Sequence, residues 1–217
     1  MKLFVDTGSI KEIEAVAALG IIDGVTTNPS LLAKESGDFR QNLKRICEIV
    51  KGPVSGEVTA TDTAGMLQQG HDIAKIHQHM VVKVPLTKDG IKACKALSGE
   101  GIRVNVTLCF SAAQALLAAK AGATYISPFV GRLDDVATNG MELIREIVEI
   151  YDNYEFATEV LVASCRHPIH IVTAARLGAD ICTCPPAVIE GMFKHPLTDI
   201  GLERFLKDWE KAQAARV

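Results

Sequence analysis

Short apolar segments rich in β-branched residues alternate with amphipathic segments of helical period along the whole 217-residue chain. About eight such pairs follow one another, at a mean repeat of about 27 residues. Alternating strands and helices with short connections favour a parallel sheet. Eight repeats in one chain favour its closure into a (β/α)₈ barrel. The predicted strands cover residues 3–7, 24–28, 53–60, 80–86, 102–108, 124–130, 156–163 and 180–185.

The segments between these strands carry apolar residues at helical spacing. Gly20 is a natural stop for the first helix, and five polar residues stand where an N-cap side chain is expected. The predicted helices cover residues 10–20, 39–52, 63–77, 88–101, 111–123, 141–151 and 168–179, and the expected N-caps are Ser9, Asp38, Asp62, Ser111 and Asn139.

An open doubly wound sheet is the alternative arrangement of the same units. That fold usually carries a glycine-rich phosphate loop after its first strand. Here the first strand runs into DTGSIKEIE, which has no GxGxxG or Walker pattern. No linker or low-complexity tract divides the chain, so we expect a single barrel domain over residues 1–217.

Two more helices are predicted after the eighth strand, a short one within residues 186–196 and an amphipathic one over about 198–214. The longer helix either closes the chain's own barrel or docks on a neighbouring subunit, and its pattern does not choose between the two. Its apolar side consists of Ile200, Leu202, Phe205, Leu206 and Trp209.

Charge and hydropathy exclude several classes of protein. Hydrophobic residues make up 48% of the chain, charged residues 23%, and the net charge is −3, which argues against bulk binding to nucleic acid or anionic membranes. The apolar stretch at the N-terminus is too short for a signal-peptide core. No apolar run approaches the roughly 18 residues of a membrane span. We therefore expect a cytoplasmic protein without nucleic-acid or membrane partners.

The cysteines and histidines give no metal-binding pattern. Six scattered cysteines without a CxxC pair are expected to be free thiols, several of them buried. Cys182 and Cys184 form a CxC, but no second pair at zinc-ligand spacing accompanies it. His167 and His170 are expected at the start of a helix, also without a metal.

Lys83 is the residue that most needs a chemical explanation. It lies among Val81, Val82 and Val84 in a strand that reads as buried on both faces, and lysine is almost never fully buried without a reason. Desolvation in a barrel interior is expected to lower the pKa of its amine. A neutral buried amine is a nucleophile for a carbonyl carbon and forms a Schiff base.

Other polar residues gather at the carboxyl ends of the predicted strands, where barrel enzymes carry their active sites. Each also has a plain structural interpretation. Asp6 and Asn28 are suited to capping a helix or turn, Asn105 and Thr107 to satisfying each other, and Ser127 to a turn. The set consists of Asp6, Thr26, Thr27, Asn28, Glu57, Lys83, Asn105, Thr107, Ser127, Arg132, Ser164 and Arg166.

Two basic residues and a hydroxyl follow the sixth and seventh strands. Arg132, Ser164 and Arg166 together suit an anion clamp, and barrel phosphate sites often lie in this region. The plain alternative for Arg132 is a surface ion pair with Asp134 or Asp135. The sequence therefore favours a site that combines an amine nucleophile with a phosphate-binding site about one sugar length away.

Several long motifs, in register over essentially the whole chain, resemble the transaldolase family, specifically its small-subunit branch together with the fructose-6-phosphate aldolases. The motifs are GVTTNPSL, KVPLT, NVTLCFSAAQA, ISPFVGR, SCRHP and the closing HPLTDIGLERFLKDW. The resemblance implies transfer of a dihydroxyacetone unit in the pentose phosphate pathway. The donor is a ketose phosphate (sedoheptulose 7-phosphate or fructose 6-phosphate), and the acceptor is an aldose phosphate (glyceraldehyde 3-phosphate or erythrose 4-phosphate).

The resemblance also implies a role for each site residue. Lys83 would form the Schiff base, Asp6 would act as acid and base at the C4 hydroxyl, and Glu57 and Thr107 would hold a proton-shuttling water. Dihydroxyacetone binding would fall to Asn28, Asn105 and Ser127, and phosphate binding to Arg132, Ser164 and Arg166.

Two positions bear on the branch of the family. The aldolase branch tends to carry Gln where this chain has Glu57 and Tyr where it has Phe129, which lines the same site. We therefore favour the transferase over a fructose-6-phosphate aldolase that releases free dihydroxyacetone, and over a barrel that binds phosphosugars without catalysis. The resemblance implies no cofactor or metal, and a homo-oligomer built as a pentamer or a pair of pentamers.

Overall fold

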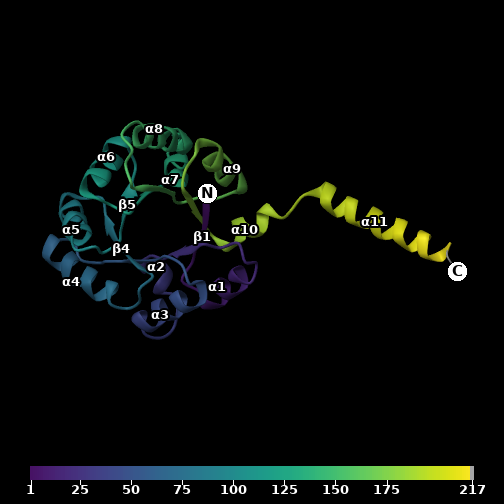
Figure 1. Ribbon diagram of the computed structural model, residues 1–217, viewed down its shortest axis with the longest axis horizontal. Helices are drawn as coiled ribbons and strands as arrows, with labels where there is room; N and C mark the ends of the chain where they lie inside the picture. Colours follow the sequence, from purple (N-terminus) through teal and green to yellow (C-terminus); the bar gives the residue numbers. More distant parts are fainter. Residues whose placement is uncertain (216–217) are drawn as a thin grey trace.

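Eight parallel strands close into a barrel in chain order, with helices around the outside (Figure 1). The computed structural model describes residues 1–215, and it confirms the predicted (β/α)₈ fold. The strands are β1 (Lys2–Asp6), β2 (Gly24–Thr26), β3 (Val54–Glu57), β4 (Met80–Pro85), β5 (Val104–Cys109), β6 (Tyr125–Pro128), β7 (Glu159–Val162) and β8 (Ile181–Cys184).

Helices connect the strands as predicted, with two short additions. The helices α2 and α7 were not predicted, and they directly follow β2 and β6. The helices are α1 (Ile10–Ala17), α2 (Pro29–Leu32), α3 (Phe39–Val50), α4 (Thr63–Ala74), α5 (Lys88–Gly99), α6 (Ala112–Ala121), α7 (Val130–Asp134), α8 (Gly140–Asn153), α9 (Pro168–Leu177), α10 (Pro186–Met192) and α11 (Pro196–Ala214).

Four of the five predicted N-caps act through their side chains. Asp38, Asp62, Ser111 and Asn139 each accept a hydrogen bond from a backbone N–H in the first turn of the helix that follows. Ser9 stands before α1, but its side chain makes no capping hydrogen bond. Ser9 therefore occupies the predicted N-cap position, but the prediction that its side chain caps the helix was wrong.

The barrel interior is divided into an apolar half and a polar half. At the amino-terminal end, Phe4, Val81, Tyr125 and Leu161 form a small cluster of their own with Ile181. Gly24 is required beside it, because a Cβ at that position would lie 2.6 Å from the Phe4 ring. Side chains alternate along a strand, so the inward positions two residues further on form a second layer, and this layer is largely polar.

Strand register brings the predicted catalytic residues into one row. Lys83 on β4 pairs with Glu57 on β3 and with Asn105 on β5. Asp6 pairs with Thr26 on β2. Because parallel strands end together, these side chains share the carboxyl-terminal mouth of the barrel.

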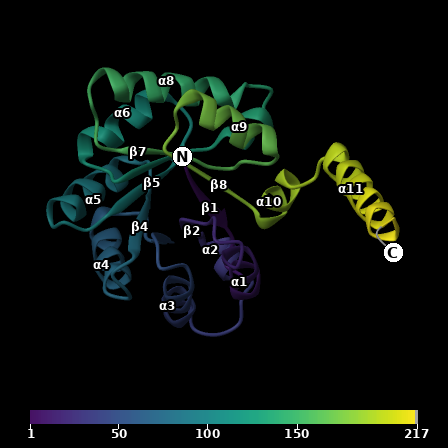
Figure 2. The same cartoon turned by 45° about the vertical axis from the view of Figure 1, so that its right-hand side comes forward.

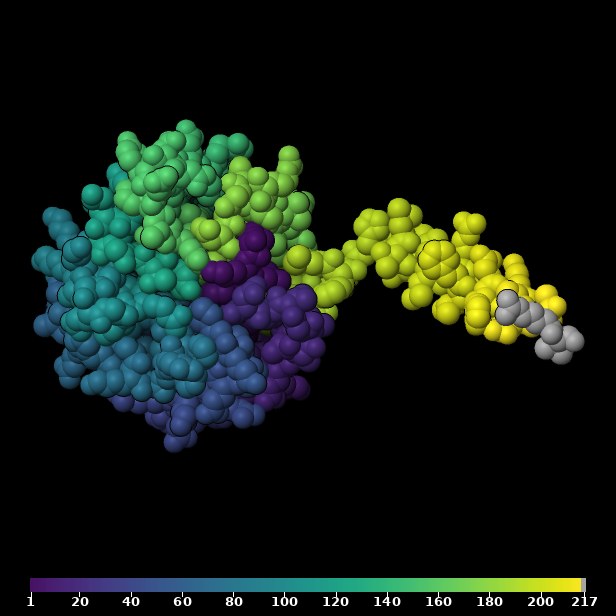
Figure 3. All heavy atoms as spheres, in the orientation of Figure 1, coloured from purple at the N-terminus to yellow at the C-terminus, as the bar shows by residue number. Residues whose placement is uncertain are grey.

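The C-terminal helix α11 projects away from the barrel, as Figures 1 and 2 show from two directions. The space-filling view in Figure 3 shows it joined to the barrel through a narrow neck. No residue of α11 is buried, and Phe205 and Trp209 are 72% and 60% exposed. The helix therefore does not close its own barrel, which was one of the two arrangements that the sequence left open. Within residues 1–215, no helix is long and apolar enough to cross a membrane.

Candidate active site

Lys83 is held inside the barrel by two oxygen atoms. Its exposed fraction is only 5%, which confirms that it is buried. The Nζ atom donates to the Thr27 carbonyl oxygen at 3.0 Å and lies 3.0 Å from Oε2 of Glu57. An amine in this position has an acid–base partner within direct proton-transfer distance.

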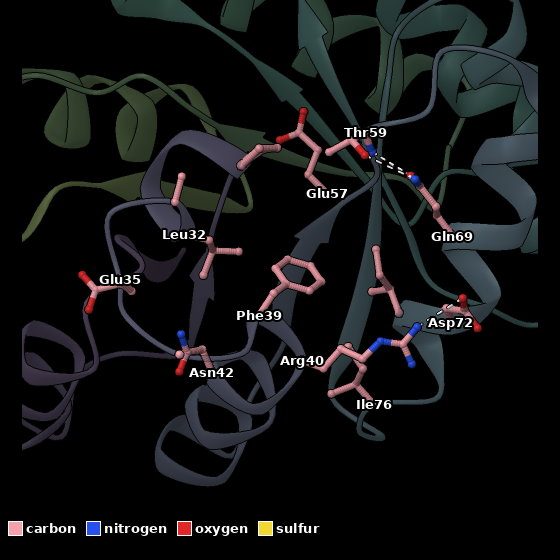
Figure 4. Close-up of a pocket in the computed structure, with 14 residues that line it drawn as sticks. Leu32, Glu35, Phe39, Arg40, Asn42, Glu57, Thr59, Gln69, Asp72 and Ile76 are labelled. Atoms are coloured by element: carbon pink, nitrogen blue, oxygen red, sulfur yellow. Dashed lines mark hydrogen bonds and ion pairs between the residues drawn. The ribbon is translucent and has the colours of Figure 1, made fainter.

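Glu57 lies between the barrel interior and a groove on the outside of the molecule. The groove has a volume of about 540 Å³ and runs between α2, α3 and α4. Figure 4 shows Glu57 with Thr59 and Gln69 near one end of it and Arg40 and Asp72 near the other. Gln69 accepts hydrogen bonds from the backbone N–H groups of Thr59 and Ala60, at 2.8 and 3.0 Å. These contacts tie the loop after β3 to α4 and so fix the backbone next to Glu57.

Asp6 ends β1 at the wall of the same interior site. Its Oδ1 accepts a hydrogen bond of 2.6 Å from the Thr26 hydroxyl, and that hydroxyl lies 2.7 Å from the Thr183 hydroxyl. Burial raises the pKa of Asp6, while the Thr26 hydrogen bond and the charge of Lys83 act in the opposite direction. A carboxyl with a raised pKa is suited to moving protons near neutral pH.

Asn105 is fixed by hydroxyls on two other strands. Its Nδ2 donates to Ser55 Oγ at 3.2 Å, and its Oδ1 accepts from Ser127 Oγ at 2.8 Å. The interpretation of Asn105 and Thr107 as partners of each other is therefore wrong. The interpretation of Ser127 as a turn residue is also wrong, because it lies within β6 and is 1% exposed.

Thr107 carries an unsatisfied polar atom. Its Oγ1 is buried and has no hydrogen-bond partner, which is true of no other buried side-chain nitrogen or oxygen in residues 1–215. A buried hydroxyl without a partner is costly, and such groups usually serve a bound water or ligand. The hydroxyl is thus suited to a small molecule held inside the barrel.

Asn28 combines a structural contact with a free donor group. Its Oδ1 accepts a hydrogen bond from the Leu31 backbone N–H at 2.9 Å and caps α2, as the plain interpretation predicted. The amide nitrogen remains to donate to a ligand, because Asn28 also lines the interior cavity.

The start of α7 carries Phe129 and Arg132 to the rim. The guanidinium of Arg132 lies 4.9 Å from the centroid of the Phe129 ring, and the Phe110 ring meets Phe129 edge-on. Gly131 lets this segment approach the loop after β7, because a Cβ there would lie 2.3 Å from the Ser164 carbonyl oxygen. Ser164 itself has a left-handed φ of 60°, a conformation that is held at some cost in a residue other than glycine.

Arg166 is paired with a carboxylate at the surface. Its two terminal nitrogens bind both oxygens of Asp135, each at 2.5 Å. Asp135 thus pairs with Arg166, and Asp134 pairs with His170, so the plain alternative of an ion pair between Arg132 and one of these carboxylates is wrong. His170 anchors the same loop, because its Nδ1 accepts a hydrogen bond from the Arg166 backbone N–H and its Nε2 lies 3.0 Å from Asp134 Oδ2.

Seven of the eleven predicted site residues line one polar cavity of about 130 Å³. Two of the remaining residues reach it through neighbours, Glu57 through Lys83 and Asn105 through Ser127. Thr107 is buried opposite Pro85 in the adjoining strand, and Arg166 turns toward Asp135. The predicted residues that line the cavity are Asp6, Asn28, Lys83, Ser127, Phe129, Arg132 and Ser164.

Three hydroxyl residues of the site were missed or given no role from the sequence. Ser55 holds Asn105, Thr183 lines the cavity, and Thr26 contacts Asp6. The sequence carries no distinct signal for Ser55 and Thr183, because a small hydroxyl residue is tolerated inside a short strand. Their use became visible only when the register placed them beside their partners.

The six cysteines are free and buried, which confirms the thiol prediction. Cys165 and Cys182 lie closest, with 3.2 Å between their sulfur atoms. Burial raises the pKa of Cys47 and of Cys184 to about 12. Across residues 1–215, no three His, Cys, Asp or Glu side chains are grouped so that they could hold a metal ion.

Comparisons with known proteins show which family the chain belongs to. Residues 3–216 match the profile of the family described as Transaldolase/Fructose-6-phosphate aldolase. A probable transaldolase of Caldicellulosiruptor saccharolyticus is 61% identical over 97% of this chain and 98% of its own. A probable transaldolase of Anaeromyxobacter sp. (strain K) is 60% identical over 99% of both chains.

One solved structure shows how widely the architecture is shared. Thiamine phosphate pyrophosphorylase from Pyrococcus furiosus superimposes with a TM-score of 0.61 over 86% of both chains, at 16% identity. Identity this low speaks for the barrel fold alone, because one fold supports many unrelated reactions.

Proposed function

Because this chain belongs to the transaldolase/fructose-6-phosphate aldolase family, we propose that it is a transaldolase of the pentose phosphate pathway. It moves a dihydroxyacetone unit from sedoheptulose 7-phosphate or fructose 6-phosphate to glyceraldehyde 3-phosphate or erythrose 4-phosphate. The observation that carries the proposal is the buried Lys83 amine, held 3.0 Å from the Glu57 carboxylate at the polar end of a barrel.

The first chemical step is formation of the Schiff base. Lys83 passes a proton to Glu57, and the neutral amine attacks the C2 carbonyl carbon of the ketose phosphate. The resulting carbinolamine loses its oxygen as water and leaves a protonated imine. Glu57 and the unpartnered Thr107 hydroxyl hold the water that carries protons in this step and in the final hydrolysis.

The second step breaks the C3–C4 bond. Asp6 takes the proton of the C4 hydroxyl, C4 leaves as the aldehyde of an aldose phosphate, and the bonding electrons move into the protonated imine to give an enamine. The raised pKa of Asp6 suits a group that must first take this proton and then return it to the acceptor. Because the imine accepts the electrons, the reaction needs neither a metal nor an organic cofactor.

The remaining residues hold the two ends of the sugar. Asn28, Asn105 and Ser127 orient the dihydroxyacetone part, and the hydroxyl network that fixes Asn105 limits its movement. The phosphate is bound by Arg132, by Ser164 and by Arg166, since guanidinium groups suit phosphate oxygens. Phe129 lies against the enamine and excludes water from it.

The decisive experiment measures release of glyceraldehyde 3-phosphate from fructose 6-phosphate, with and without erythrose 4-phosphate. A transaldolase releases it only with the acceptor, whereas an aldolase releases it equally well without. Borohydride should fix the ketose phosphate covalently to the wild type and to Lys92→Met, a change of an exposed lysine on α5. It should not do so to Lys83→Met. If the wild type gains no mass, the barrel binds phosphosugars without this chemistry.

Phe129 gives a second test of the choice between transferase and aldolase. A tyrosine hydroxyl at this rim position would supply or orient a water near the enamine and favour its protonation. Phe129→Tyr should therefore raise the release of free dihydroxyacetone relative to transfer. An unchanged ratio of the two activities would remove Phe129 as the determinant.

We further propose that the protein acts in the cytoplasm as a single-domain homo-oligomer, a pentamer or a pair of pentamers. The apolar side of α11, whose residues are all exposed in the single chain, supports this assembly. Light scattering of the chain with and without the residues after Asp199 should show a loss of assembly on truncation. An unchanged mass would exclude α11 from the interface.

A further inference from the structure

Three side chains on adjacent strands form a hydrogen-bonded row that ends at Asp6. Thr183 on β8, Thr26 on β2 and Asp6 on β1 are linked by oxygen–oxygen distances of 2.7 and 2.6 Å. Strand β1 lies between the other two strands, so the row spans three neighbouring strands of the barrel wall. Thr26 and Thr183 are 3% and 2% exposed, which leaves bulk water little access to the row.

The direction of the hydrogen bonds follows from proton counting. An ionised carboxylate can only accept, so Thr26 donates its single hydroxyl proton to Asp6. Its oxygen is then left to accept, and Thr183 must be the donor to Thr26. Bonds linked in this way polarise one another in a medium of low dielectric. The whole row therefore favours the ionised form of Asp6.

We propose that Thr183 is a positioning residue for the reaction, acting through Thr26 to orient and to keep ionised the carboxylate of Asp6. The inference rests on the proposed function only in that Asp6 is the acid and base of the reaction. Neither threonine was assigned a role from the sequence.

The other charged and titratable groups around Asp6 do not make the row redundant. Lys83 on β4 faces Asp6, but its charge is shared with Glu57 and changes during the reaction. The thiols of Cys165 and Cys184 stay neutral, because burial and their neighbours raise their pKa. Arg132 on α7 lines the same cavity from the rim. The two hydroxyls thus stabilise the ionised form of Asp6 in a way that does not depend on the protonation of Lys83.

The test follows the titration of Asp6 directly, by NMR of protein labelled with ¹³C in the Asp carboxyls and assigned with Asp6→Asn. Removal of the direct donor in Thr26→Val should raise the titration midpoint by about 1–2 pH units. Thr183→Val should shift it the same way by about 0.3–0.5 unit, since only the polarising bond is lost. Thr183→Ser, which keeps the hydroxyl, should titrate as the wild type does.

The double variant decides whether Thr183 acts through Thr26. If it does, Thr26→Val with Thr183→Val titrates like Thr26→Val alone. Additive shifts, or no shift in Thr183→Val, would overturn the proposal. The acidic limb of donor cleavage should move with the NMR midpoint. If the wild type fails to trap a ketose phosphate on Lys83, the proposed function fails, while the NMR titration still decides the role of Thr183.

Discussion

At the scale of single residues, opposing influences on Asp6 set the pH dependence of the proposed reaction. Burial acts most strongly and raises the pKa of Asp6, while the Thr26 hydrogen bond and Lys83 only partly offset it. The base must be ionised to take the C4 proton, so activity is lost as the pH falls through this raised pKa. We expect the acidic limb of kcat/KM for donor cleavage to lie above the ordinary range of aspartate.

The measurement is a pH–rate profile of glyceraldehyde 3-phosphate release in the presence of acceptor. Asp6→Asn should lose roughly 10²–10⁴-fold in rate at every pH, the usual contribution of a general acid or base. A wild-type profile that stays flat down to about pH 4, the reference range of carboxyl groups, would remove Asp6 and Glu57 from the proton transfers.

Arg166 poses a different question at the same scale, because the two nitrogens that we propose bind phosphate are paired with Asp135. The pair is about half exposed on both sides, so screening by water leaves it little net contribution to stability. Asp135 also competes with a bound phosphate and repels it. We expect Asp135→Asn to tighten the binding of inorganic phosphate by roughly two- to fivefold, because the exposed ion pair that the phosphate must displace is weak.

A matched surface pair provides the control for this prediction. Arg145 and Glu142 on α8 are paired at 3.1 Å with similar exposure, and Glu142 lies outside the cavity. Calorimetric titration with phosphate should give the same affinity for Glu142→Gln as for the wild type. Weaker binding in Asp135→Asn would mean that Asp135 holds Arg166 in the binding geometry and does not compete with the ligand.

Some residues of the site could be recognised from the sequence, and others could not, because their roles depend on partners on other strands. Lys83 was recognisable because a charge within a run of valines conflicts with its surroundings. Ser55 and Thr183 were not, because a small hydroxyl is tolerated inside a strand and gains meaning only from its partner on another strand. Such partnerships depend on register, which local composition does not specify.

At the scale of elements, the agreement is closest where periodicity extends over several turns. The helices of ten or more residues were predicted to within a few positions, whereas α2 and α7 were missed. These have four and five residues, too few to show an apolar stripe. All the predicted strands except the fifth ran too far at their carboxyl ends, because the chain leaves the sheet there to present residues such as Asn28.

Helix capping allows a quantitative test at this scale. Asp62 accepts a hydrogen bond of 2.9 Å from the Gly65 backbone N–H at the start of α4. Asp62→Ala should therefore lower the free energy of unfolding by about 1 kcal/mol. Ser9→Ala is the internal control, since Ser9 makes no side-chain cap, and it should change stability by less than about 0.5 kcal/mol. Denaturant unfolding of both variants measures the difference, and equal losses would contradict the cap assignment.

At the scale of the whole molecule, eight repeats were enough to predict the closed barrel, but not the placement of α11. An amphipathic pattern shows that a helix buries one face and does not show against what. The stripe on α11 follows helical spacing, with Leu202, Phe205, Leu206 and Trp209 all more than half exposed. An apolar stripe of this kind marks a surface for association.

Trp209 makes this association directly observable, because it is the chain's single tryptophan. If α11 docks on a neighbouring subunit, Trp209 becomes buried, and its emission should be blue-shifted in the assembled protein. Phe205→Glu places a charge in the middle of the stripe and should give both a smaller mass by light scattering and a red-shifted emission. Ala214→Glu adds the same charge on the opposite side of the helix and should change neither.

The particle mass and the Trp209 emission together distinguish the possible arrangements of α11. A blue-shifted Trp209 in a particle of monomer mass would mean that α11 folds back onto its own barrel in solution. A red-shifted Trp209 in a large particle would mean that assembly uses another surface. Only a coupled change of mass and emission in Phe205→Glu assigns the contact to this stripe, because the cost of burying an unpaired carboxylate there would exceed the gain from the remaining apolar contacts.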